Sequence, residues 1–306
     1  MLTSAHADSL SGGRSLFFKA EHEQKCGAFK ARGALNAVLS LLEEDPAAAA
    51  VCTHSSGNHG AAVAYAARLC GLPATVVVPR GTPAVKQAAI AHYGGAVVVC
   101  DPTIDAREAA SARVQAETGA AFIPPYNHPA VISGQGTCCL ELLAQVPDLD
   151  AIIVPVSGGG LISGTALAAK ALRPGILVLA AEPTGTNDAA DVAASLAAGE
   201  LVALPKPITM CDGLEARLGS LTWPIVRDFV DGVVTVSEDE VLRAMKICFE
   251  RMKVRPRWGP AWASRPPKPR NSLRPADRSP TPSPGRRPWW SRVGRPRWRR
   301  RCRRNF

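Results

Sequence analysis

Two glycine-rich segments of this chain have the residue types and spacing to bind an anionic ligand. Residues 53–60 read THSSGNHG, and residues 157–164 read SGGGLISG. Each segment follows an apolar run and precedes an alanine-rich run, which predicts a turn between a strand and a helix. Glycines at such a turn let a ligand approach the backbone, and the amides that begin the helix attract negative charge.

The second segment has the composition of a phosphate site. Its consecutive glycines Gly158, Gly159 and Gly160 expose successive N–H groups that can form a nest for a dianion. The segment is not a Walker loop, because no Gly-Lys-Ser/Thr follows it, and Ser163 stands where the GxGxxG pattern requires its third glycine. A plain tight turn is the alternative interpretation.

The first segment adds side chains that can take part in catalysis. Asn58 can donate a hydrogen bond to a ring hydroxyl. Ser56 can act as an acid or base only if its surroundings assist it, since a free serine is a very weak acid. The alternative is a serine that caps the following helix. The order strand, turn, helix and the unusual string SSGNHG favour a functional site.

Lys30 lies upstream in the string GAFKARGA, at the start of an expected helix that runs to Leu42. Small neighbours and Phe29 would partly desolvate its amine, and a desolvated amine has a lowered pKa and attacks carbonyl groups more readily. Alone, this lysine would be interpreted as an exposed residue at a helix start. Together with the two loops, it indicates pyridoxal phosphate (PLP) chemistry on a small amino acid.

Two carboxylates follow a later strand. Glu182 and Asp188 are six residues apart, and with loop carbonyls they suit a hard cation such as Mg²⁺ or Ca²⁺. The alternative is a pair of solvated loop acids.

The elements that must position these residues alternate along the chain. Near-continuous apolar strands separated by helices predict an α/β protein with parallel sheets that are covered on both faces. Two sheets are expected, and ligands should bind beyond the carboxyl ends of their strands. The expected strands are 50–53, 74–78, 96–99, 151–155 and 176–180, and the expected helices are 61–70, 83–93, 105–118 and 161–172.

Charge and composition change abruptly near residue 255. Residues 255–306 contain 17 Lys or Arg, one acid, eleven prolines and five of the six tryptophans, and the rest of the chain is net acidic. This tail shows no periodicity, so we expect it to lack fixed structure. A basic tail with interleaved aromatics can bind RNA or an anionic membrane; the alternative is that it is not a selected sequence.

Nine scattered cysteines include no CxxC pair. This pattern predicts reduced thiols and a cytoplasmic protein. No apolar run in the sequence reaches 18 residues, and we expect no signal peptide.

In their order, these motifs resemble the fold-type II PLP-dependent enzymes, the family of serine and threonine dehydratases, and among them the eukaryotic serine racemases. The resemblance runs from about Leu2 to Lys253. It is carried by GAFKARGALNAV, THSSGNHG, the run from Ile132 through GQGT, SGGGLISG, AEP, Asp212-Gly213 and Thr222-Trp223-Pro224. It implies a fold like that of the tryptophan synthase β subunit, with a large domain from residues 1–49 and 128–254 and a small domain from residues 50–127.

The resemblance also implies roles for individual residues. Lys30 would hold PLP covalently and act as a base on one face of the substrate, and Ser56 would be the acid or base on the opposite face. Asn58 would contact the 3′-hydroxyl of PLP. The phosphate would be bound by Ser157, Gly158, Gly159, Gly160 and Leu161. The substrate carboxylate would be bound by Ser55, Ser56, Asn58 and His59. Mg²⁺ or Ca²⁺ would be bound by Glu182, Asp188 and the carbonyl of Thr186.

The implied activity is the interconversion of L- and D-serine, with β-elimination of serine to pyruvate and ammonia, in a homodimer. A threonine dehydratase or a serine ammonia-lyase is the alternative within the family. Ser56 favours the racemase, because threonine dehydratases typically carry alanine there.

Both ends depart from the family pattern. The family has a helix before the position of Leu2. After Val254 it continues with a Glu-Pro segment and a Ser-Gly-Gly-Asn stretch whose serine meets the PLP ring nitrogen; residues 255–306 match neither. We therefore expect the tail to arise from a shifted reading frame or an altered exon, and this form of the chain to fold poorly. An inactive isoform with a polyanion-binding tail is the third hypothesis.

Overall fold

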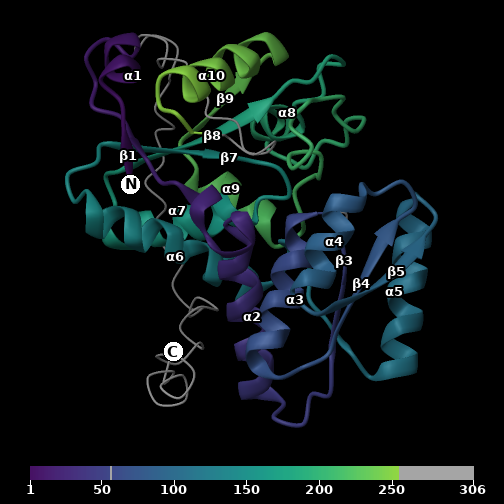
Figure 1. Ribbon diagram of the computed structural model, residues 1–306. Coiled ribbons are helices and arrows are strands. Elements are labelled where there is room, and N and C mark those ends of the chain that lie inside the picture. Colours follow the sequence, from purple (N-terminus) through teal and green to yellow (C-terminus); the bar gives the residue numbers. More distant parts are fainter. Residues whose placement is uncertain (56, 255–306) are drawn as a thin grey trace. The chain divides into compact units, whose positions relative to one another are not determined.

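The computed structural model describes residues 1–55 and 57–254, all within one compact unit. Two parallel sheets organise this part of the chain (Figure 1). The first sheet has the strand order β5-β4-β3-β6 and contains β3 (Val51–His54), β4 (Ala74–Pro79), β5 (Gly95–Cys100) and β6 (Ala121–Phe122). The second has the order β7-β8-β9 and contains β7 (Ala151–Pro155), β8 (Leu177–Pro183) and β9 (Gly232–Val236).

Helices connect the parallel strands, as such crossovers require. The connecting helices are α3 (Asn58–Cys70), α4 (Ala84–His92), α5 (Ile104–Thr118), α6 (Pro129–Gln145), α7 (Gly160–Leu172), α8 (Asp191–Ala198) and α9 (Thr222–Phe229). Helix α2 (Lys30–Glu44) precedes the first of these strands, and α10 (Glu238–Glu250) follows the last. The N-terminal segment adds α1 (Ala5–Leu10) and an antiparallel pair, β1 (Leu2–Thr3) and β2 (Phe17–Phe18). The predicted α/β class is confirmed.

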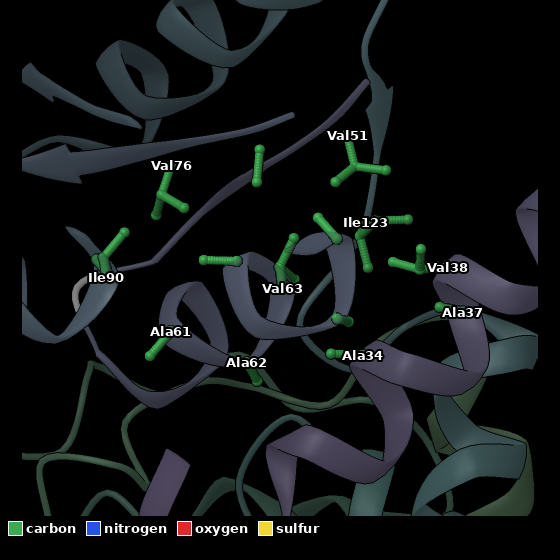
Figure 2. Packing of buried hydrophobic residues seen from close by; sticks show 14 of the residues in the cluster. Ala34, Ala37, Val38, Val51, Ala61, Ala62, Val63, Val76, Ile90 and Ile123 are labelled. Carbon is green, nitrogen blue, oxygen red and sulfur yellow. The ribbon is translucent and has the colours of Figure 1, made fainter. Parts of the chain in front are cut away.

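The inner strands of the first sheet, β3 and β4, are largely buried on both faces, which explains their mostly apolar composition. Side chains alternate between the faces, so Val51, Val76 and Val78 pack toward α2, α3 and α4. Cys52 and Val77 pack on the opposite face against α5. Figure 2 shows the first of these clusters, in which Val63 of α3 points toward the strands that carry Val51 and Val76, and small side chains fill the space around α2 and α3. The small alanine side chains let the helices approach the sheet closely.

Every expected strand and helix is present, with ends that differ by a few residues. The sequence patterns did not predict α1, α6, α8, α9, α10, β1, β2, β6 or β9. The first sheet lies within residues 51–122 and the second within residues 151–236. The proposed boundaries of a large and a small domain remain a prediction. The tail at residues 255–306 lies outside the described residues.

Helix α6 packs between α2 and α7 through glycines. A Cβ added to Gly164 of α7 would lie 2.3 Å from the carbonyl oxygen of Ile132, and one added to Gly134 would lie 2.7 Å from the carbonyl oxygen of Arg32. The backbone N–H of Gly33 donates to Oε1 of the buried Gln135 at 3.2 Å. The three helices therefore lie at backbone contact, and α6 sets the separation between Lys30 at the start of α2 and the glycine-rich turn before α7.

Within the described part of the chain, Cys52, Cys100, Cys138, Cys139, Cys211 and Cys248 are free thiols. Among the helices of that part, none has the length and apolar character needed to span a membrane.

Gly164→Ala should destabilise the protein by roughly 1–3 kcal/mol, because the new methyl group would overlap the backbone of α6. Gly175→Ala is the matched control, since no atom lies within 4 Å of a Cβ placed there. Thermal unfolding followed by circular dichroism should show a melting temperature several degrees lower for the first variant only. Equal melting temperatures would contradict the close approach of α6 and α7.

Candidate active site

Lys30 is the first residue of α2, and its amine is held by a backbone carbonyl. Nζ donates to the carbonyl oxygen of Pro125 at 2.6 Å and lies 5.2 Å from the ring centroid of Phe29. Burial lowers the pKa of Lys30 to about 8, because the protonated amine loses hydration. A larger share of the amine is therefore unprotonated near neutral pH than for an exposed lysine, as covalent catalysis requires.

The segment at residues 123–126, which follows β6, joins the other parts of the site. The carbonyl of Ile123 accepts a hydrogen bond from Thr53 Oγ1 at 2.8 Å and lies 3.0 Å from His59 Nε2. Two residues later, the carbonyl of Pro125 accepts the hydrogen bond from Nζ of Lys30. The ring of Tyr126 lies against the glycine turn, since a Cβ added to Gly158 would be 2.4 Å from its Cδ1 atom.

His59 is buried near Lys30. Burial, followed by the positive charge of Lys30, lowers the pKa of His59 to about 3, so its ring is neutral at physiological pH. Nδ1 has no hydrogen-bond partner in the structure. A neutral ring beside the lysine avoids the repulsion that a second cation would cause.

The glycine turn begins helix α7. Gly159 has φ +88°, a left-handed conformation that glycine adopts without steric cost, and Gly160 is the first helical residue. The first amides of a helix have no intrahelical acceptor, and the dipole of the helix favours negative charge there. Ser157 ties the turn to the segment before α9, because its Oγ accepts from the Ala216 N–H at 2.9 Å and donates to the Ala216 carbonyl at 3.1 Å. This geometry fits the phosphate of PLP.

The other expected ligand-binding residues lie at the start of α3. Asn58 is its first residue, and the side chain of Ser55 accepts from the Gly57 N–H at 3.2 Å. The helix has 13 residues, so its N-terminal amides favour a carboxylate. Ser56 lies outside the described residues.

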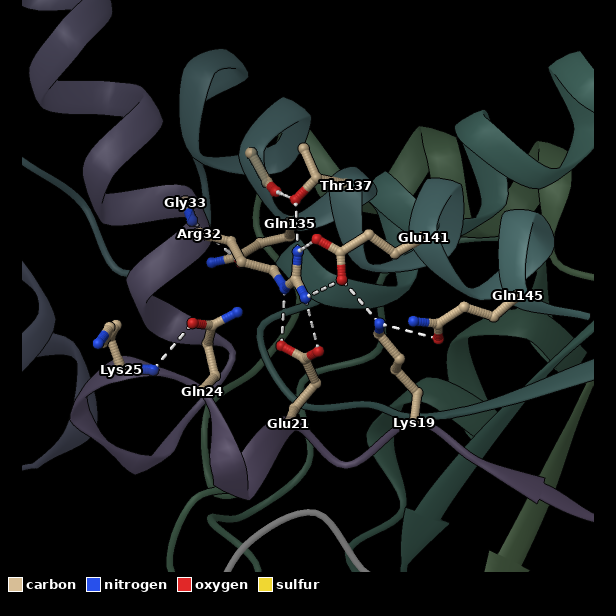
Figure 3. A network of polar contacts seen from close by, with 11 residues as sticks. Lys19, Glu21, Gln24, Lys25, Arg32, Gly33, Gln135, Thr137, Glu141 and Gln145 are labelled. Atoms are coloured by element: carbon tan, nitrogen blue, oxygen red, sulfur yellow. Dashed lines mark hydrogen bonds and ion pairs between the residues drawn. The ribbon is translucent and has the colours of Figure 1, made fainter. Parts of the chain in front are cut away.

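A network around Arg32 anchors the helix that carries Lys30 (Figure 3). The largely buried guanidinium pairs with Glu21 at 2.7 Å and with Glu141 of α6 at 2.7 Å. The hydrogen bond from Arg32 lowers the pKa of Glu141 to about 2, and Lys19 adds a further 2.7 Å contact. The first turn of α2 is thus tied to both α6 and the N-terminal segment.

Of the three expected metal ligands, Glu182 lies within β8 near its carboxyl end, and Thr186 and Asp188 lie in the loop that follows. Both carboxylate oxygens of Glu182 accept backbone N–H bonds, from Val192 and Ala193 at 2.9 Å, and so cap α8. Burial, with a smaller effect of the nearby Asp191, raises the pKa of Glu182 to about 7. Asp188 and Thr186 are exposed. No group of three or more His, Cys, Asp or Glu side chains suited to a metal occurs within residues 1–55 and 57–254.

Sequence reasoning missed four residues that shape the site. Pro125 and Tyr126 contact Lys30 and the glycine turn, and Asn127 and Thr222 hold the segment before α9. Thr222 belongs to a motif that carried the family resemblance, but no role was assigned to it. The others stand in a loop without any catalytic pattern, so their positions become evident only in three dimensions.

Comparison with known proteins gives consistent results. The family described as "Pyridoxal-phosphate dependent enzyme" matches residues 2–258. The chain is 54% identical over 254 residues to a serine racemase of Arabidopsis thaliana, covering 83% of this chain and 75% of that protein. It is 49% identical over 259 residues to a serine racemase of Homo sapiens, covering 83% and 74%. The structure of maize serine racemase superposes with a TM-score of 0.79 at 53% identity, covering 83% of this chain and 75% of that one.

The lowered pKa of Lys30 makes a testable prediction. Because only the unprotonated amine attacks an aldehyde, attachment of PLP to protein freed of cofactor should become faster as the pH rises, with a midpoint near 8. An ordinary lysine would give a midpoint near 10.4. Borohydride reduction at successive times, followed by peptide mass spectrometry, measures the adduct.

Lys30→Ala should abolish this adduct, whereas Lys25→Ala, which removes an exposed lysine five positions earlier, should leave it unchanged. A full yield of covalent adduct in the Lys30→Ala protein would refute the assignment.

Proposed function

Because this chain belongs to the fold-type II pyridoxal-phosphate dependent enzymes, we propose that it is a serine racemase that interconverts L- and D-serine and also eliminates water from serine to give pyruvate and ammonia. One observation carries the proposal. The dipeptide Pro125-Tyr126 contacts the amine of Lys30 with its carbonyl and the glycine turn with its ring. The lysine and the glycine turn proposed to bind the phosphate thus contact the same dipeptide, which supports a site for PLP.

When bound, PLP withdraws electrons from the α-carbon of an amino acid and so acidifies its proton. Lys30 has an amine with a lowered pKa to remove that proton from one face. The amides at the start of α3, with Ser55, Asn58 and His59, would orient the substrate carboxylate. Asn58 would bind the 3′-hydroxyl of PLP.

We propose Ser56 as the acid or base on the opposite face. The motif THSSGNHG supports this assignment, as does the racemisation chemistry itself, which needs proton donors on both faces of the α-carbon. Elimination of the β-hydroxyl needs only the base on the Lys30 face. Ser56 therefore separates the racemase from a plain dehydratase.

Relatives with dehydratase chemistry keep a second candidate open. The chain is 46% identical over 252 residues to a β-hydroxyaspartate dehydratase of Paracoccus denitrificans, and covers 78% of it. A threonine dehydratase or serine ammonia-lyase is the corresponding alternative here. Measuring D-serine and pyruvate from the same L-serine incubation distinguishes the two, because a dehydratase would form pyruvate alone.

Ser56→Ala should reduce racemisation at least tenfold more than it reduces pyruvate formation, because only racemisation uses the second face. Ser9→Ala, which changes an exposed serine of α1, is the control and should alter neither rate. Chiral chromatography and a coupled pyruvate assay give the two rates. Equal losses would show that Ser56 has no separate role as a base.

We also propose Mg²⁺ or Ca²⁺ binding by Glu182, Asp188 and the carbonyl of Thr186. The buried carboxylate of Glu182 supports it, because a neighbouring cation would favour its charged form. Millimolar Mg²⁺ or Ca²⁺ should then raise the melting temperature, since binding to the folded state stabilises it. Asp188→Asn should remove this shift, and Asp148→Asn, at another exposed loop acid, should keep it. A shift that survives in Asp188→Asn would exclude this site.

A homodimer and a cytoplasmic location complete the proposal. The first is implied by the family resemblance, and the free thiols in the described part of the chain support the second. The inactive isoform with a polyanion-binding tail concerns residues outside the described part, and a chain that forms neither D-serine nor pyruvate would favour it.

A further inference from the structure

We propose that Thr222 is a positioning residue that holds the glycine turn in its phosphate-binding conformation. The proposal rests on the assignment of residues 157–161 to the phosphate of PLP and gives a specific role to a residue outside that set. The hydroxyl of Thr222 is fully buried and contacts the turn directly.

Thr222 is the first residue of α9, and its side chain has 0% exposure. Its Oγ1 lies 2.8 Å from the carbonyl oxygen of Gly158, to which it donates, and accepts from the N–H of Gly219 at 2.8 Å. A hydroxyl has one proton, and the carbonyl of Gly158 is closer to Oγ1 than the carbonyl of Gly219, which is 3.3 Å away. The single donor of Thr222 is therefore directed at the glycine turn.

This hydrogen bond fixes the orientation of a peptide group. In a trans peptide the C=O and the following N–H point in opposite directions. When the carbonyl of Gly158 is held by Thr222, the N–H of Gly159 points away from Thr222 and remains available to an anion. Gly159 also packs directly against Thr222, because a Cβ added to Gly159 would lie 2.7 Å from the Cβ of Thr222. Without the hydroxyl, the flexible glycines could rotate this amide out of the nest.

The position of Thr222 is itself fixed from a second side. Asn127 Oδ1 accepts from the Leu221 N–H at 2.8 Å, and its Nδ2 donates to Ser220 Oγ at 3.1 Å. The neighbouring Tyr126 packs against Gly158, as described above. The loop after β6 thus braces both the turn and the segment that carries Thr222.

A purely structural role is the competing explanation, because Oγ1 also closes a local turn with Gly219. The two roles differ in what they do to ligands with and without a phosphate. PLP and pyridoxal share the ring and the aldehyde, and only PLP has the phosphate group. If Thr222 positions the turn, its loss lowers the affinity for PLP alone. If its loss loosens the whole site, the affinities for PLP and pyridoxal both fall.

The experiment compares dissociation constants of PLP and pyridoxal in absorbance titrations of protein freed of cofactor. Thr222→Val keeps the shape of the side chain and removes the hydroxyl, and Thr222→Ser keeps the hydroxyl. We expect Thr222→Val to raise the dissociation constant of PLP at least tenfold and that of pyridoxal less than twofold. Thr222→Ser should bind PLP within about threefold of the unaltered protein.

Equal weakening of both ligands in Thr222→Val, or a loss in Thr222→Ser as large as in Thr222→Val, would overturn the proposal. If Thr222→Val does not fold, Thr222→Ala provides the same comparison; failure of both to fold while Thr222→Ser folds would show a structural role and also overturn it. If the unaltered protein binds PLP no more tightly than pyridoxal, the phosphate assignment itself is wrong. The D-serine assay reports separately on the proposed activity.

Discussion

The hydrogen bond from Lys30 to the carbonyl of Pro125 is the contact on which the rest of the site depends. It places the amine of α2 against a loop that comes 95 residues later, in a setting dry enough to lower the pKa of the lysine to about 8. The same loop supplies Ile123 to the His59 side chain and Tyr126 to the glycine turn. A short stretch of backbone therefore sets the relative positions of Lys30, helix α3 and the glycine turn, which we propose as the base, the carboxylate-binding helix and the phosphate site.

That arrangement can be maintained only because the supporting helices are held at fixed distances. Glycines of α6 meet the backbones of α2 and α7, where any side chain would overlap neighbouring atoms. Arg32 then joins α2 to α6 and to the N-terminal segment through carboxylates on two sides. Packing and ion pairing thus act on adjacent residues of α2. The contacts of Gly33 with α6 set the distance between these helices, and the ion pairs of Arg32 stabilise the first turn beside Lys30.

Glu182 illustrates how one carboxylate can have two consistent interpretations. As a helix cap it satisfies two backbone amides at the start of α8, which a buried helix end requires. As a proposed cation ligand it would gain the positive charge that its buried carboxylate lacks. Each oxygen has more than one lone pair, so the two roles are compatible. The capping role was not evident from the sequence, because Val192 and Ala193 contribute only their backbones.

The sequence by itself determined the α/β class, the expected strands and the glycine turns, because these depend on local periodicity and on residue types that few other segments share; it also singled out Lys30 as the proposed site of covalent attachment. It did not reveal α6, whose glycines resemble a loop and whose burial on several sides hides the periodic stripe of an ordinary surface helix. Only the tertiary structure decided the environment of Lys30, the contact of Tyr126 with the turn and the hydrogen bond of Thr222 to Gly158. These interactions join residues 32 to 95 positions apart, often through backbone carbonyls that every residue possesses, so no pattern of side chains along the chain can predict them.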